Sequence, residues 1–75
     1  GSGPIPAIAV ANYERINKLD GSHLDALWYL GLAASERGEE GVARQYWQRL
    51  LERLPTDSAD ARAIKSKIDA LGGEG

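Results

Sequence analysis

The sequence predicts an all-α fold of about four antiparallel helices, arranged as a fragment of an α–α superhelix. No segment alternates apolar and polar residues with a period of two, which is the pattern of a half-buried strand. Apolar residues instead recur every three or four positions in four stretches, each bounded by glycine, proline or a helix-capping residue. The chain also resembles itself at a shift of 34 residues, which indicates a helical repeat.

The first predicted helix runs from about Pro6 to Leu19, with Ala9, Tyr13 and Ile16 on one stripe. The Asp20-Gly21 pair ends it, because both residues are typical of turns.

The second predicted helix begins after Ser22 and continues to Arg37. Ser22 and Asp25, three residues apart, resemble a capping box at its start. Gly38 is a natural C-terminal stop, since glycine adopts the left-handed conformation that follows many helices.

The third predicted helix begins at Glu39 and Glu40, whose charges favour a helix N-terminus, and it ends near Arg49 and Arg53. Pro55 closes it. Its apolar stripe consists of Ala43, Trp47, Leu50 and Leu54.

The fourth predicted helix is capped by Thr56 or Asp57 and stops at Gly72-Gly73. Its apolar stripe consists of Ala61, Ile64, Ile68 and Leu71.

The shift of 34 residues places Ala9 on Ala43, Tyr13 on Trp47, Ile16 on Leu50 and Gly21 on Pro55. This period is that of the tetratricopeptide (TPR) repeat, a pair of antiparallel helices with the pattern W-x2-L-G-x2-Y, then A-x3-F, then P. The sequence resembles this pattern with apolar replacements at the aromatic positions. The matching residues are Leu27, Leu30, Gly31, Ala34, Ala43, Trp47 and Pro55.

This resemblance divides the chain into five parts. Residues 1–3 look like the remnant of an expression tag, 4–21 like the second helix of a truncated repeat, and 22–55 like one complete repeat. Residues 56–71 would form a closing helix, followed by a tail over 72–75.

Gly31 lies inside a predicted helix, where glycine costs about 1 kcal/mol relative to alanine. Gly31 and Ala43 are both small residues. We therefore expect the two helices of the repeat to approach closely at these positions. The expected structural core is Leu27, Leu30, Gly31, Ala34, Ala43, Trp47, Leu50 and Pro55.

Trp28 and Leu32 point away from Leu27, so the second helix is apolar over a wide arc and either is sandwiched or lines a groove. Continuing the 34-residue register aligns Arg62 with Trp28 and Ser66 with Leu32, so Arg62 could hold a ligand carboxylate beside an apolar shelf. The alternatives without a ligand are that Trp28 belongs to the core and that Arg62 is a solvated residue, paired with Asp60 or Asp69. The expected peptide groove is Asp25, Trp28, Leu32, Ser35, Arg62 and Ser66.

Composition argues against several other function classes. The 75 residues carry a net charge of -2 with no basic block, so we expect no nucleic-acid partner. One histidine and no cysteine cannot form the usual zinc sets, and no phosphate-binding glycine loop or Ser–His pair occurs, so we expect no metal, cofactor or catalysis. The longest apolar run, residues 5–11, is too short to span a bilayer, so we expect no direct membrane contact.

Beyond the generic repeat, the run over residues 24–71 resembles the periplasmic TPR domain of c-type cytochrome biogenesis proteins of the CcmI/CycH type, and the resemblance covers about residues 9–71. The residues that carry this resemblance are 26–31, Gly38, Tyr46-Trp47, Leu50-Leu51, Leu54-Pro55, Asp57-Ser58, Ile64 and Ile68. It implies a non-enzymatic domain in the periplasm, in a parent protein anchored in the inner membrane. Its implied partners are the C-terminal helix of an apocytochrome and the subunits of the haem lyase. The alternatives are a TPR scaffold of another bacterial assembly, such as secretion or pilus machinery, and a self-associating structural fragment.

Overall fold

A computed structural model describes residues 6–21 and 23–71. Over these residues the chain forms four helices and no strand: α1 (Ala7–Leu19), α2 (Leu24–Glu36), α3 (Glu40–Glu52) and α4 (Ala59–Ala70). The all-α fold of four helices predicted from the sequence is therefore confirmed. The predicted features at residues 1–3, Ser22 and residues 72–75 lie outside the described residues.

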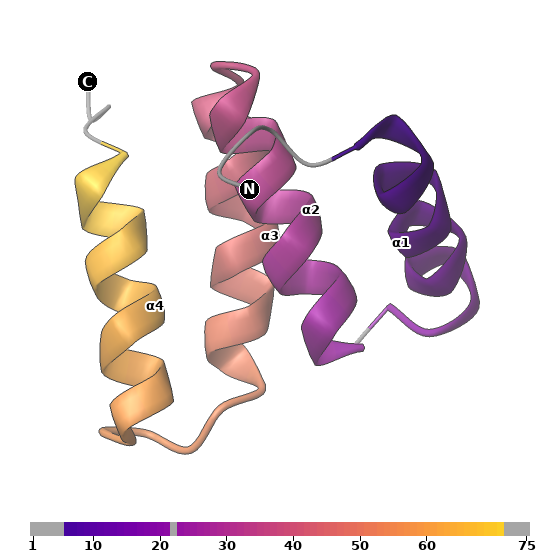
Figure 1. Cartoon of the computed structure of the whole chain (residues 1–75). Coiled ribbons are helices and arrows are strands. Elements are labelled where there is room, and N and C mark those ends of the chain that lie inside the picture. Colours follow the sequence, from indigo (N-terminus) through magenta and orange to yellow (C-terminus); the bar gives the residue numbers. More distant parts are fainter. Residues whose placement is uncertain (1–5, 22, 72–75) are drawn as a thin grey trace.

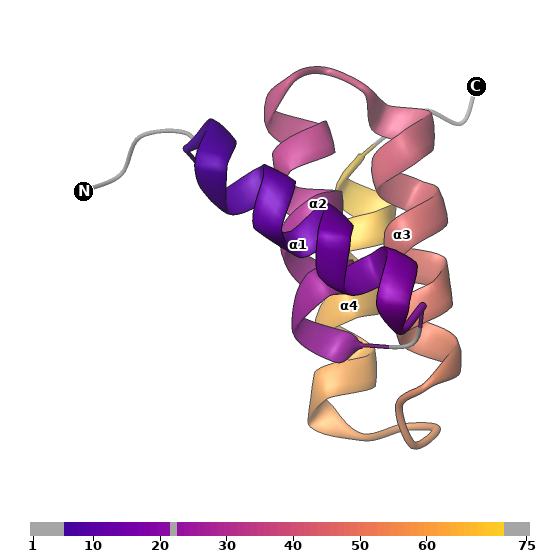
Figure 2. The same ribbon diagram turned by 90° about the vertical axis from the view of Figure 1, so that its right-hand side faces the viewer.

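Successive helices run antiparallel, and α2 and α3 form a hairpin at the centre of the molecule (Figure 1). The helix α1 packs on α2 from one side, and α4 packs on α3 from the other. Figure 2 shows α1 crossing in front of the central hairpin, with α4 behind it. None of the described helices has the length and apolar character needed to cross a membrane.

The turn between α2 and α3 is built on Gly38, as predicted. Gly38 has a φ of +79°, which glycine adopts without a steric penalty. Its backbone N–H donates to the carbonyl of Ser35 at 3.0 Å, and the N–H of Glu39 donates to the carbonyl of Ala34 at 2.9 Å. These two bonds form a Schellman motif, which satisfies carbonyls left unpaired at the end of a helix.

The N-caps of α2 and α4 differ from the predicted ones. His23 caps α2, since its Nδ1 accepts the backbone N–H of Ala26 at 3.2 Å. Ser58, and not Thr56 or Asp57, caps α4 by accepting the N–H of Ala61 at 3.0 Å. Asp57 instead takes a φ of 64° in the preceding turn, a left-handed conformation that aspartate tolerates better than most residues, so the helix starts later.

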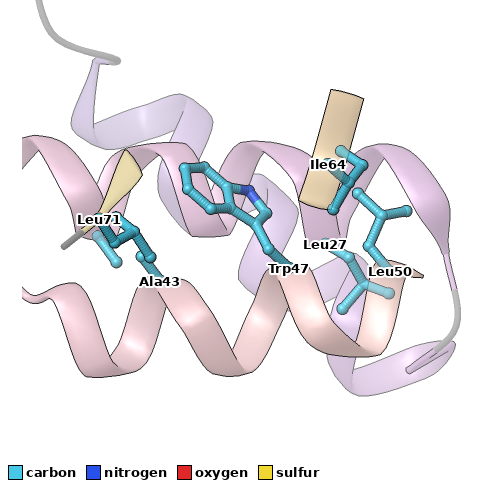
Figure 3. Packing of buried hydrophobic residues seen from close by; sticks show 7 residues of the cluster. Leu27, Ala43, Trp47, Leu50, Ile64 and Leu71 are labelled. Atoms are coloured by element: carbon cyan, nitrogen blue, oxygen red, sulfur yellow. The ribbon is translucent and has the colours of Figure 1, made fainter. Parts of the chain in front are cut away.

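The core lies between α2, α3 and α4 and is centred on Trp47 (Figure 3). Trp47 and Leu27 are its largest fully buried side chains. The core cluster consists of Leu27, Ala34, Ala43, Trp47, Leu50, Ile64 and Leu71. Leu30 and Gly31 are buried as well, whereas Pro55 is exposed because it lies in the turn between α3 and α4.

The close approach expected at Gly31 occurs between α2 and the indole of Trp47. A Cβ atom at Gly31 would lie 2.7 Å from Cε2 of Trp47 and would overlap the neighbouring Cδ1 and Nε1 atoms as well. The indole N–H of Trp47 donates to the carbonyl of Trp28 at 3.1 Å, which satisfies a polar group that would be costly to bury unpaired.

The helix α1 is the most peripheral of the four, and none of its residues is buried. Tyr13 stacks on Tyr29 of α2, with ring centroids 4.8 Å apart. Arg49 of α3 donates to the carbonyl of Gly21 at 3.0 Å and so ties the α1–α2 turn to the central hairpin.

Candidate binding cleft

A cleft of about 370 Å³ opens where α2 and α4 begin and α3 ends. This volume falls at the lower end of the range for small-ligand sites, which are typically apolar with a few polar groups. The apolar residues that line it are Leu24, Trp28, Leu50, Leu54, Ala63 and Ile64. Because Leu50 and Ile64 also belong to the core cluster, the cleft borders the core.

Trp28 forms part of the cleft wall and is also anchored to the core. Its side chain is half-buried, and its ring stacks on Trp47 with centroids 5.6 Å apart and planes inclined by 24°. From α4, the Nζ atom of Lys67 lies 5.8 Å from the ring centroid, within the range of a cation–π contact. The sequence left open whether Trp28 packs in the core or lines a groove. In the structure its ring packs on the core residue Trp47 and also lines the cleft.

Three charged residues line the cleft. Asp25 lies in the first turn of α2, Asp60 lies in the first turn of α4, and Lys67 follows two turns further along α4. The positive end of a helix dipole favours a carboxylate in a first turn, which accounts for the placement of Asp25 and Asp60 within the fold.

The structure brings only part of the predicted groove into this cleft. Asp25 and Trp28 line it. Leu32 is half-buried against the core, and Ser35 is half-buried near the far end of α2. Neither of these two residues lines the cleft.

Arg62 and Ser66 are exposed on α4 and do not line the cleft. Arg62 lines a separate hollow over the α3–α4 turn, beside Thr56 and Lys65. In the 34-residue register Ile64 corresponds to Leu30, and both are buried. The α4 residue that lies over the Trp28 ring, however, is Lys67 and not Arg62.

The groove predicted from the sequence lacks the α4 residues that line the cleft, namely Asp60, Ala63 and Lys67. These residues are spaced three and four positions apart, with Ile64 of the predicted apolar stripe among them, so they share one helix face. That spacing was the available signal.

The described residues contain no group of three or more His, Cys, Asp or Glu side chains placed to hold a metal ion. The single histidine is engaged as a helix cap. At the opposite end of α2, the exposed pair of Arg37 and Glu39 is joined at 3.0 Å. Its hydrogen bond and the charge of Glu39 raise the pKa of the Arg37 guanidinium.

The chain is similar to a known protein. Over 71 residues the chain is 31% identical to the cytochrome c-type biogenesis protein CycH of Bradyrhizobium diazoefficiens. The aligned region covers 95% of this chain and 19% of the relative, so the chain spans about a fifth of the length of CycH. No family model matches the chain, and no solved structure matches it significantly. The alignment supports a relationship to proteins of the CycH type.

Proposed function

We propose that this chain is a non-enzymatic protein-interaction module that binds a helical segment of an apocytochrome during the maturation of c-type cytochromes. The similarity to CycH along nearly the whole chain supports the process. The observation that carries the binding role is the cleft beside Trp28, where a large aromatic side chain stays half-exposed although its ring is fixed against the core.

The geometry supports recognition of a helix in a groove. In this mode an amphipathic helix places apolar anchors in a hydrophobic channel. The cleft offers six apolar side chains and a rigid aromatic wall, and buried aromatic residues dominate the binding energy of many interfaces. The proposed ligand is the C-terminal helical segment of the apocytochrome, and the proposed setting is the periplasm, in a parent protein that also contacts the haem lyase.

Chemical-shift mapping with a peptide of an apocytochrome C-terminal helix tests this proposal. We expect the largest perturbations at Trp28, including its indole N–H, and at Ala63 and Ile64 across the cleft. Perturbations confined to the outer face of α3, around Gln48, Arg49 and Glu52, would contradict the cleft assignment.

One observation favours self-association as a second candidate function. Ile8 and Leu19 of α1 are 74% and 83% exposed, and their spacing of eleven residues places them on the same face of the helix. Sedimentation velocity over a range of concentrations separates the two functions. A monomer at all concentrations is expected for the binding module, and a concentration-dependent dimer would favour self-association.

A further inference from the structure

The charges at the cleft indicate which ligand it suits. Two carboxylates, Asp25 and Asp60, line the cleft from the first turns of α2 and α4. Neither carboxylate has a hydrogen-bond or ion-pair partner among residues 6–21 and 23–71. A cation on a ligand could therefore approach either carboxylate without breaking a contact to any of these described residues.

Lys67 is the one cation that lines the cleft, and unlike the two carboxylates it has a partner in the protein. Its Nζ atom lies over the Trp28 ring at 5.8 Å, where the negative face of the indole attracts it. The net formal charge of the cleft is thus negative, and its cation is already engaged with an aromatic ring. Arg62, which the sequence offered as a possible partner for a ligand carboxylate, lines a different hollow.

We infer that the cleft selects a polypeptide segment in which an apolar anchor is flanked by lysine or arginine. The anchor occupies the apolar space beside Trp28, and the flanking cations lie near Asp25 and Asp60. This inference rests on the proposed function and specifies its ligand. It differs from the hypothesis drawn from the sequence, in which Arg62 could hold a ligand carboxylate.

Three helical peptides with one leucine-rich anchor face and different flanking residues test the inference. The flanking positions carry lysine in the first peptide, glutamine in the second and glutamate in the third. Affinities are measured by fluorescence anisotropy at low and high salt. We expect the lysine peptide to bind most tightly and the glutamate peptide most weakly, with the difference reduced at high salt because mobile ions screen exposed charges.

Substitutions in the protein test which of its charged residues cause the preference for the lysine peptide. Asp25→Asn and Asp60→Asn should each weaken the lysine peptide by about two- to fivefold, as is typical of exposed charge pairs. Glu40→Gln is the matched control, because Glu40 also lies in a first helical turn but does not line the cleft, and it should leave affinity unchanged. Lys67→Gln should tighten the lysine peptide, because it removes a like charge and uncovers the Trp28 ring.

The possible failures are distinguishable. If the three peptides bind equally well, or if the glutamate peptide binds best, the inferred ligand charge is wrong while the proposed binding function stands. If Lys67→Gln weakens the lysine peptide, the charge assignment is overturned as well. If no peptide binds at any salt concentration, the proposed function fails and the inference fails with it.

Discussion

Gly31 of α2 lies directly against the indole of Trp47 in α3. The space between them is too small for even one added carbon atom at Gly31. Gly31→Ala adds a Cβ that overlaps a buried ring. We expect it to lower the free energy of unfolding by about 1–3 kcal/mol, which is typical of overpacking.

Gly41 provides the matched control for Gly31→Ala. An added Cβ at Gly41 of α3 would meet no atom within 4 Å. Gly41→Ala should therefore stabilise the protein by about 0.4–1 kcal/mol through the lower entropy of its unfolded chain. Urea titrations of both variants provide the comparison, and equal gains at Gly31 and Gly41 would show that the two helices do not approach closely.

The two tryptophans should differ in their contribution to stability. Trp47 is 2% exposed, and Trp47→Ala should cost about 3–5 kcal/mol, enough to unfold much of so small a protein. Trp28 is only half-buried, and Trp28→Ala should cost about 1–3 kcal/mol from lost stacking and partial burial. Thermal melts followed by circular dichroism distinguish the two, and equal losses would mean that Trp28 is an ordinary core residue.

Of the four helices, α1 is the one that has no buried residue. In the 34-residue register its Ala9, Tyr13 and Ile16 correspond to the buried Ala43, Trp47 and Leu50 of α3, yet all three are only half-buried. We expect the amide hydrogens of α1 to exchange with solvent faster than those of α2 and α3, since little burial opposes local opening. Equal protection in native-state hydrogen exchange would show that α1 unfolds only with the whole molecule.

The helices were predictable because each has a clear apolar stripe and a recognisable stop, as at Gly38. The caps were less predictable, since several adjacent polar residues could serve and only the backbone path selects Ser58. The α4 side of the cleft was missed for a different reason. A repeat register aligns positions between helices, but the rotation of α4 about its own axis depends on how Ile64 and Leu71 reach the core.

In the molecule as a whole, Trp28 contributes both to the fold, by packing on the core, and to the proposed function, by lining the cleft. The Trp28 ring stacks on the central core residue, which fixes it at the wall of the cleft. A rigid aromatic wall costs little entropy when a ligand binds, so the cleft is suited to hold an apolar anchor. The similarity to CycH extends over the same helices that build this cleft.

The most direct test is the affinity of an apocytochrome C-terminal peptide for Trp28→Ala compared with Arg62→Ala, measured by calorimetry after amide spectra confirm that both variants are folded. We expect Trp28→Ala to weaken binding by more than about tenfold, as loss of an aromatic anchor does. Arg62→Ala should leave affinity within about twofold of the original, because Arg62 lies outside the cleft. Unchanged affinity in Trp28→Ala, or a larger loss in Arg62→Ala, would contradict the assignment of the cleft as the binding site.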